Sequence, residues 1–271
     1  MNTLIRLLKK RWIISTILVL IAMGVMIRLG IWQLERLEAR RAFNNRVLEQ
    51  VNQPMLLITG QEMYPDLSHM EYRQVSVTGE YDHEHQVALR NQHWGNQWGV
   101  HLVTPLRIKD SDQSILVDRG WIPSEEYLSG DWSKFDEPGL VHVSGVIRAS
   151  QSKADFGSRS DPAPEPGMSA QKSWNFINIT ALQEQSPYQL LGAYIQQAPD
   201  SAWKGIPYRT QPDIEITEGP HMGYAIQWFS FAAVLGIGYI FYLRNQRKPK
   251  TNNAASKDRF NLPAAGEEIG R

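Results

Sequence analysis

Two long apolar segments stand near the two ends of an otherwise polar chain. The first is WIISTILVLIAMGVMIRLGIW (Trp12–Trp32) and the second is GYAIQWFSFAAVLGIGYIFYL (Gly223–Leu243). Each is long enough to cross the hydrocarbon core of a bilayer, which takes about 20 helical residues. Tryptophans and tyrosines lie toward the ends of both segments, as they do in the aromatic belts of membrane proteins. The pattern therefore predicts two transmembrane helices, which we place over residues 12–34 and 223–243.

The residues that flank the two segments predict how the chain sits in the membrane. Basic residues precede the first segment, as in a signal peptide, but no small-residue cleavage pattern follows it. Instead QLERLEARRAFNNRVLEQV continues without proline or glycine, with apolar residues at helical spacing, which predicts a helical extension over 35–52. Basic tails at 1–11 and 244–271 predict that both termini are cytoplasmic. The polar composition of the second tail also predicts disorder.

The region between the spans, residues 53–220, is patterned as strands. Alternating runs such as YRQVSVTGEY (Tyr72–Tyr81) are separated by turn-rich pieces such as NQHWGNQ. Several short strands close in sequence predict an antiparallel sheet, either a small barrel or a sandwich. A capping pattern from Thr180 to Gln183 predicts a short helix, and Gln151–Lys172 has the composition of a mobile loop. The predicted fold class is a membrane protein with two transmembrane α-helices enclosing a mainly antiparallel β (α+β) exported domain.

Composition and motifs exclude several classes of function. Basic and acidic residues both number 28, so no basic surplus points to a nucleic-acid partner. The chain has no cysteine, which excludes disulfides, thiolate metal sites and a lipidated cysteine anchor. It also lacks a nucleophile elbow, a Walker A loop, a zincin helix and the glycine pattern of dinucleotide-binding folds. The sequence therefore predicts no enzyme and no catalytic residue.

The middle region offers two weaker candidate sites. Four histidines could ligate a metal: His83, His85, His93 and His101. The first two are two residues apart on a predicted strand edge and would share a face, but scattered surface histidines are the commoner explanation. The stretch ILVDRGWIP is interpreted as a buried strand that ends in a Gly-Trp turn. Its Asp118 and Arg119 are expected to pair with neighbours, because a lone Asp–Arg pair defines no reaction.

Polar and aromatic residues gather where the spans meet the outer side of the membrane. In an antiparallel pair, the end of the first span and the start of the second lie at the same membrane level. Two sets would meet there: Arg28, Gly30, Trp32, Gln33 and Arg36 from the first span, and His221, Tyr224, Gln227 and Trp228 from the second. His221, Tyr224 and Trp228 fall on one helix face. Gln227 is expected to hydrogen-bond to the other helix, and Gly30 to let the backbones approach closely.

Singly, each of these residues is explained by the aromatic belt or by the start of a helix. Together they supply an imidazole for axial ligation, aromatic walls for a macrocycle and guanidinium groups for propionates, which are the groups needed to hold a haem. The chemistry alone fits other amphiphilic ligands equally well. Intramembrane polar clusters mark functional sites by default. We therefore predict a cofactor-binding site made of His221, Tyr224, Trp228, Arg28 and Arg36, in which His221 would ligate the iron if the bound molecule is a haem.

The sequence resembles the Surfeit-locus (SURF/Shy) family of cytochrome c oxidase assembly proteins. Five collinear blocks carry the resemblance: GIWQLERLEAR, EYRQVSVTGEYD, GVHLVTPLRI, ILVDRGWIP and GPHMGYAIQWFSFA. The resemblance implies a non-enzymatic helper that binds haem a transiently and passes it to the catalytic subunit of the oxidase, with a haem a synthase as a second candidate partner. It maps the family's membrane histidine onto His221 and its Gly-x-Trp-Gln block onto Gly30, Trp32 and Gln33. Motif positions with structural or partner-contacting roles map onto Tyr72, Arg73, Arg119, Gly120 and Pro123.

Two rival functions stay open at this point. One is a haem-independent membrane clamp or scaffold that stabilises the oxidase catalytic subunit during assembly. The other is a membrane-anchored enzyme with a metal at His83 and His85. The short basic N-terminus lacks the Ser/Arg-rich amphipathic stretch of an organelle transit peptide, which favours a bacterial plasma (inner) membrane. The protein would be multi-pass, in contact with membrane lipid, with its central domain on the outer, periplasmic side.

Overall fold

The computed structural model describes residues 10–60, 64, 66–153, 161, 170–201, 203–212, 214 and 216–245. Most of both predicted tails and most of the predicted loop Gln151–Lys172 lie outside these residues. The chain divides into two compact units, 1–40 with 218–271 and 41–217. We call the first unit the helix pair and the second the β domain, and each is described by itself.

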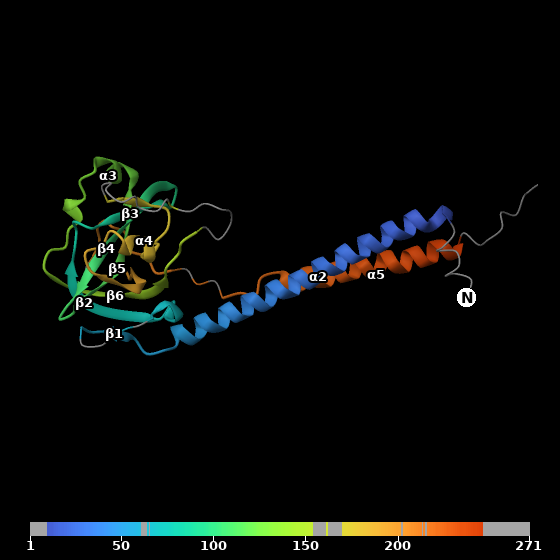
Figure 1. Cartoon of the computed structure of the whole chain (residues 1–271), viewed down its shortest axis with the longest axis horizontal. Helices are drawn as coiled ribbons and strands as arrows, with labels where there is room; N and C mark the ends of the chain where they lie inside the picture. Colours follow the sequence, from blue (N-terminus) through green and yellow to red (C-terminus); the bar gives the residue numbers. More distant parts are fainter. Residues whose placement is uncertain are drawn as a thin grey trace, which may run out of the picture. The chain divides into compact units, whose positions relative to one another are not determined.

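The helix pair is formed by the two apolar helices. Helix α2 (Lys10–Val51) lies against helix α5 (His221–Asn245) within this unit (Figure 1). The helices are antiparallel, because Thr16 Oγ1 near the start of α2 is hydrogen-bonded to Tyr239 Oη near the end of α5 at 2.6 Å. Both helices are long and apolar enough to cross a membrane. The predicted layout, two candidate membrane helices flanking a β-rich domain, is confirmed.

Small residues line the contact between α2 and α5. Ala225 and Ala232 of α5 are only 1% and 4% exposed. A β-carbon on Gly30 of α2 would lie 2.7 Å from the Phe229 ring, so the absence of a side chain at Gly30 makes room for that ring. Small residues at such contacts are typical of helices that associate in membranes. The side chains that point away from the contact are mostly exposed and apolar, as lipid-facing positions require.

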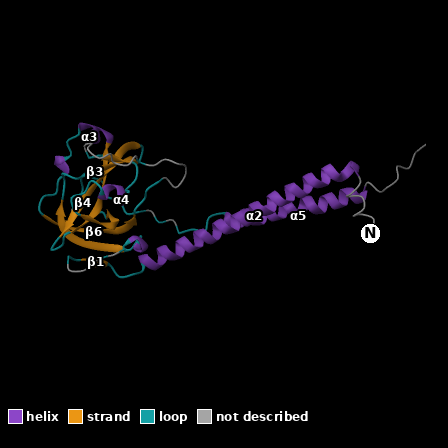
Figure 2. Ribbon diagram, in the orientation of Figure 1, coloured by secondary structure: helices purple, strands orange, loops and turns teal. Residues whose placement is uncertain are grey.

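The β domain is built on one eight-stranded sheet with the order β1-β2-β6-β8-β5-β4-β3-β7. The strands are β1 (Leu56–Ile58), β2 (Gln74–Tyr81), β3 (Val87–Trp94), β4 (Gln97–Ile108), β5 (Gln113–Pro123), β6 (Leu140–Ala149), β7 (Ser173–Trp174) and β8 (Gln189–Gln197). A further pairing of β2 with β4 closes β2, β6, β8, β5 and β4 into a barrel (Figure 2). Most pairings are antiparallel, but β1–β2, β3–β7 and β5–β8 are parallel. Of the two predicted arrangements, the barrel is the one that forms.

The barrel interior is the main hydrophobic core. Alternate residues of the strands point inward, among them Val75 and Val77 of β2 and Ile115 and Val117 of β5, all at most 2% exposed. Burying one such aliphatic side chain stabilises the fold by about 1.5–3 kcal/mol. Short helices cover the outside: η1 (Ser68–Met70), α3 (Ser124–Ser129), η2 (Ser133–Phe135) and α4 (Ile179–Gln183).

The Gly-Trp turn predicted at the end of the ILVDRGWIP strand does not form. Strand β5 does not stop at a Gly-Trp turn but continues through Gly120 and Trp121 to Pro123. It can do so because its pairing with β4 contains a bulge between Leu102 and Val103, and Gly120 adopts a φ of 115° at that point. Only glycine adopts such a backbone conformation readily. The Gly-Trp pair is therefore an irregularity inside a strand.

The predicted cap of the short helix is also wrong. Asn178 precedes α4, and its side chain accepts a hydrogen bond from the Ala181 N–H at 3.3 Å. Thr180 instead lies inside the helix. Asparagine is among the preferred N-cap residues, so the chain had two capping patterns close together and the earlier one forms. Helix α4 ends at Gln183, and Gln189 already begins β8.

Candidate functional site

His221 is the first residue of α5. Gly219, with a φ of 67°, makes the turn that precedes the helix, and the Tyr224 N–H donates to the Pro220 carbonyl at 3.1 Å. Proline in the first turn of a helix is favoured, because its missing N–H would have no partner there in any case. This local sequence holds the His221 backbone at the start of the membrane helix. Its side chain is half-buried.

The His221 side chain makes one hydrogen bond across the helix pair. Its Nδ1 lies 2.8 Å from Gln33 Oε1 of α2. A carboxamide oxygen can only accept, so Nδ1 is the donor in this bond. In the neutral imidazole, Nε2 then carries the lone pair. Within the described part of the chain, no residue hydrogen-bonds to Nε2. The imidazole ring is thus oriented by Gln33, and the lone pair of Nε2 is available to ligate a metal ion.

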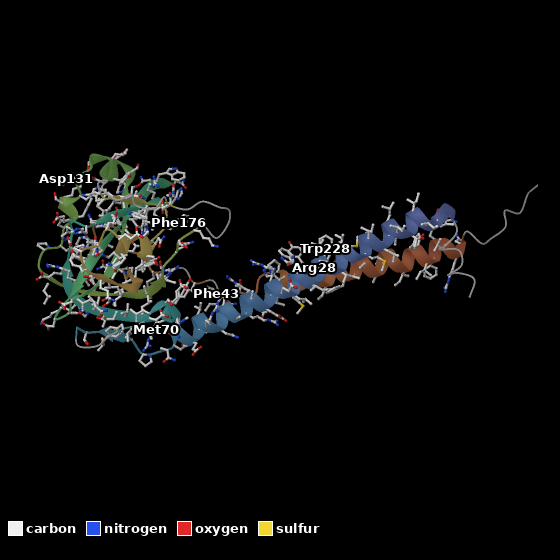
Figure 3. All side chains as sticks on the ribbon, viewed as in Figure 1. Arg28, Phe43, Met70, Asp131, Phe176 and Trp228 are labelled. Atoms are coloured by element: carbon white, nitrogen blue, oxygen red, sulfur yellow. The ribbon has the colours of Figure 1, made fainter. Side chains whose placement is uncertain are left out.

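The two predicted arginines lie on α2 at or near this level. Arg28 is paired with Glu35 of the same helix at 3.4 Å, and both side chains are more than half exposed. Arg36 is exposed and forms no ion pair with any residue that the structure describes. Figure 3 labels Arg28 and Trp228 at the same level of the two helices. Because neither arginine is buried, both guanidinium groups remain accessible to an anionic group of a ligand.

The aromatic residues of the predicted site divide into two groups. Tyr224 and Trp32 are 49% and 45% exposed and form the outer surface of the helix pair. Trp228 is half-buried and packs edge-on against Phe231, with ring centroids 6.1 Å apart. The structure adds Phe229, which the sequence had not suggested. The ring of Phe229 lies beside Gly30, so its place in the site comes from a position without a side chain.

The predicted role of Gln227 is wrong. At 100° per residue Gln227 lies about 200° around α5 from Ala225, which faces α2. The Gln227 side chain is exposed and makes no hydrogen bond with any residue in the described part of the chain. The glutamine that bridges the two helices is Gln33. Ala225 and Ala232 set the rotation of α5 about its own axis. This rotation decides which glutamine side chain can hydrogen-bond to the other helix.

Tyr72 and Arg73, two of the family-block residues, hold the end of α2 against the barrel. The Tyr72 ring contacts Phe43 of α2 edge-on at 6.2 Å, and the Arg148 guanidinium stacks on the ring at 4.8 Å. Arg73 Nε donates to the Pro54 carbonyl at 3.0 Å. Tyr72 has a φ of 73°, which is rare for an aromatic residue and is held here by these contacts. The geometry gives both residues a structural role in the β domain.

Arg119 and Pro123 are also placed by contacts inside the β domain. Arg119 is fully buried; it donates to Gln86 Oε1 at 2.9 Å, to the Phe135 carbonyl and to Glu137 Oε1 at 3.0 Å. Pro123 ends β5 and directly precedes α3. The sequence interpretation of Arg119 as an internally paired residue agrees with these bonds. Its carboxylate partner is Glu137 rather than the adjacent Asp118.

The four histidines that the sequence offered as metal ligands do not form a metal site. His83 and His85 lie in the turn after β2 rather than on a strand, and each pairs with its own carboxylate, Asp136 at 3.1 Å and Asp82 at 2.8 Å. His93 packs against Trp98, and His101 pairs with Asp118. No group of three or more potential ligands occurs among the described residues. The predicted sharing of one strand face by His83 and His85 is therefore wrong.

The His101–Asp118 pair predicts a pH-dependent stability of the β domain. Burial of His101 works against its charged form, but the Asp118 carboxylate at 2.8 Å outweighs this effect and raises the pKa of His101 above its usual value. The folded protein thus holds this proton more tightly than the unfolded chain. The stabilisation is fully present below the unfolded pKa of about 6.5 and is lost as the pH rises through the folded pKa.

We expect the free energy of unfolding to fall for this reason as the pH rises above about 6.5 and through the raised pKa of His101. Chemical denaturation of the full chain in detergent at several pH values measures the effect. The matched variant is His101→Gln, which keeps a hydrogen-bond donor but cannot be charged. Its unfolding free energy should depend less on pH in this range, and equal pH dependence in both proteins would contradict the prediction.

Comparison with known proteins places the chain in a family. A model described as the SURF1 family matches residues 20–233, which include Gln33, His221 and the whole β domain. A SURF1-like protein of Caenorhabditis elegans is 25% identical over 86% of this chain and 75% of its own length. Surfeit locus protein 1 of Xenopus tropicalis is 24% identical (76% and 68%), and that of Mus musculus is 22% identical (81% and 72%). The resemblance seen in the sequence is confirmed, and this chain belongs to the SURF1 family.

Proposed function

We propose that this protein is a non-enzymatic assembly factor for cytochrome c oxidase that binds haem a at His221 and delivers it to the catalytic subunit. The oxidase is suggested by the family resemblance of the five sequence blocks. Haem a is suggested by the same resemblance, and the helix pair supplies groups that fit a haem. The observation that carries the proposal is the hydrogen bond from His221 Nδ1 to Gln33 Oε1.

This hydrogen bond is the arrangement that metal-ligating histidines usually have. Metal-binding histidines almost always donate their second ring N–H to an oxygen, which fixes the ring and makes the ligating nitrogen more basic. Gln33 supplies that oxygen, and Nε2 is left with its lone pair. The residues present therefore fit a haem in kind. His221 would ligate the iron, Trp228 and Tyr224 would contact the macrocycle, and Arg28 and Arg36 would attract the propionates.

The same residues suit a carrier better than a permanent haem protein. Tyr224, Arg28 and Arg36 are exposed, so a ligand held by them stays open on one side. One axial imidazole also binds a haem iron more weakly than two axial ligands do. A carrier must release its cargo, and an open site with one ligand permits transfer to a partner that offers a more enclosed site.

The proposal includes a location. Both helices would span the bacterial plasma membrane, with the basic flanks and both termini in the cytoplasm. The β domain would be exported to the periplasm. The start of α5, where His221 begins its helix, would then lie at the headgroup level of the periplasmic side. Haem a would be handed over from this level to the catalytic subunit.

The test is the visible spectrum of the full chain purified in mild detergent from cells that make haem a. We expect a Soret band in the parent protein, and at least a tenfold weaker band in His221→Ala, because the axial ligand is lost. Gln33→Leu should bind haem about 10–100-fold more weakly, the usual cost of removing the oxygen behind a metal-bound histidine. Gln33→Glu should retain binding, since a carboxylate also accepts from Nδ1.

The matched control is His69→Ala. His69 lies in η1 of the β domain and is largely exposed, so its loss should leave the spectrum unchanged. Circular dichroism of each variant shows whether it is folded. A colourless parent, or a band that persists in a folded His221→Ala protein, would remove haem from the proposal. The haem-independent membrane clamp would then be the better account of the family resemblance.

A further inference from the structure

Gly219 lies beside the nitrogen of His221 that the hydrogen bond with Gln33 leaves open. Gly219 and His221 both belong to the helix pair, and only Pro220 separates them in the chain. A β-carbon built on Gly219 would lie 3.5 Å from His221 Cδ2 and 3.7 Å from His221 Nε2. Both distances are ordinary van der Waals contacts. A side chain at position 219 would therefore fit against the imidazole without displacing it.

The position of that β-carbon is on the side from which a metal approaches Nε2. Apart from its chain neighbours, it would meet only Cδ2 and Nε2 of His221 within 4 Å among the described residues. The other ring atoms are farther away, so the position lies outside the Cδ2–Nε2 edge and not over the ring. The lone pair of Nε2 points outward next to this edge, away from Nδ1 and its bond to Gln33. The missing side chain of Gly219 therefore leaves open space beside the lone pair.

This open space matters most for a flat ligand. A metal bound to an imidazole lies about 2 Å from the nitrogen, and a single ion at that distance occupies little room beside the ring. A haem iron carries a macrocycle that lies across the iron–nitrogen bond and spreads sideways in all directions. A β-carbon 3.7 Å from Nε2 and outside the ring edge would overlap the space that such a macrocycle has to occupy.

We propose that Gly219 admits a planar metal macrocycle to His221, and that even a methyl group at this position would obstruct the macrocycle while leaving the imidazole in place. This inference rests on the proposed ligation of a haem iron by His221. It places the bound macrocycle against the turn formed by Gly219 and Pro220. The positive φ of Gly219, 67°, is a separate demand on the same residue. The turn alone would tolerate asparagine, which adopts a positive φ more readily than most residues do.

The test is a titration of the purified full chain in mild detergent with ferric haem b, which carries the same iron in a macrocycle of the same size as haem a. Gly219→Asn suits the turn but adds a β-carbon. We expect it to raise the dissociation constant about tenfold or more, the usual cost of overlap with a well-fitted group. Gly219→Ala places a smaller side chain at the same point and should weaken binding in the same direction.

The matched control is Gly95→Asn. Gly95 also has a positive φ, 58°, but a β-carbon there would meet nothing within 4 Å. It lies in the β domain, in the turn between β3 and β4. The affinity of Gly95→Asn for ferric haem should therefore equal that of the parent protein.

A second readout separates obstructed access from a displaced histidine. Diethyl pyrocarbonate is a small reagent that modifies accessible imidazole nitrogens, and mass spectrometry reports the modified fraction of His221. Without haem, we expect His221 to be modified in the parent and in Gly219→Asn alike. With excess ferric haem, His221 should be protected in the parent but remain reactive in Gly219→Asn.

The possible outcomes distinguish this inference from the proposed function. Equal affinity for ferric haem in the parent and in Gly219→Asn would overturn the inference and leave the proposed function standing. Loss of His221 modification in haem-free Gly219→Asn would also overturn it, because the imidazole would then have moved. A parent protein that neither binds ferric haem nor protects His221 would contradict the proposed function itself, and the role of Gly219 would fall with it.

Discussion

Gly120→Ala is expected to destabilise the β domain by about 4 kcal/mol, near the upper end of single-substitution effects. Two causes add. Gly120 has a φ of 115°, which an L-residue with a side chain rarely adopts, and an added β-carbon would lie 2.4 Å from the Tyr208 carbonyl oxygen. That carbonyl accepts from the Trp121 N–H at 2.9 Å, so moving it breaks the pairing of Trp121 with Tyr208. Denaturant unfolding of the full chain in detergent measures the loss.

Gly130→Ala is the matched control for this prediction. Gly130 also has a positive φ, 73°, but a β-carbon there would meet nothing within 4 Å. Replacing Gly130 should lower the free energy of unfolding by only about 1 kcal/mol, which is the cost of the positive φ alone. Comparable losses for Gly120→Ala and Gly130→Ala would show that the close approach of the Tyr208 carbonyl does not matter.

Glu137→Gln is expected to destabilise the β domain by about 3–5 kcal/mol, as breaking a buried ion pair usually does. Glu137 Oε1 accepts from Arg119 at 3.0 Å and from Arg209 at 2.7 Å. The two guanidinium side chains are only 0% and 4% exposed. Without the carboxylate, two buried cations would face each other with no counter-charge between them. The same unfolding experiment measures this change.

The two arginines supply the internal control. Arg209→Met removes one cation and leaves the Arg119–Glu137 pair intact, so it should cost less than Glu137→Gln. In a protein that already carries Arg209→Met, Glu137→Gln should lower the free energy of unfolding by less than it does in the parent protein. Only one cation then lacks a counter-charge. Strictly additive losses would show that charge balance at Glu137 is not what stabilises this site.

The helices and strands could be predicted because their signals are local. A bilayer of fixed thickness sets the length of an apolar run, so Trp12–Trp32 and Gly223–Leu243 were recognisable without any knowledge of the fold. The alternation of side chains along a strand is also a local property, because successive side chains point to opposite faces of the sheet. The predicted run Tyr72–Tyr81 corresponds closely to β2. Local signals were less reliable at ends of elements. Thr180 and Asn178 are both capping residues, and only the packing of α4 chose between them.

The sequence predicted which residues belong to the candidate site, but not which of them contact one another. The antiparallel order of two spans was enough to bring His221 to the level of Gln33. It could not tell which glutamine bridges the helices, because that depends on how far α5 is rotated about its own axis. The rotation follows from the packing of Ala225 and Ala232 and from the Thr16–Tyr239 hydrogen bond.

Residue type and spacing alone were thus sufficient for the two spans, the strand-rich region between them and the histidine at the start of the second span. The family was recognised by the resemblance of five sequence blocks to known proteins. The closing β2–β4 pairing of the barrel, the sharing of Glu137 by Arg119 and Arg209, and the choice of Gln33 over Gln227 became visible only in the folded chain. The physical reason is sequence separation. Glu137 meets its partners 18 and 72 residues away, and His221 meets Gln33 188 residues away. Such contacts depend on the path of the whole chain, which no local period records.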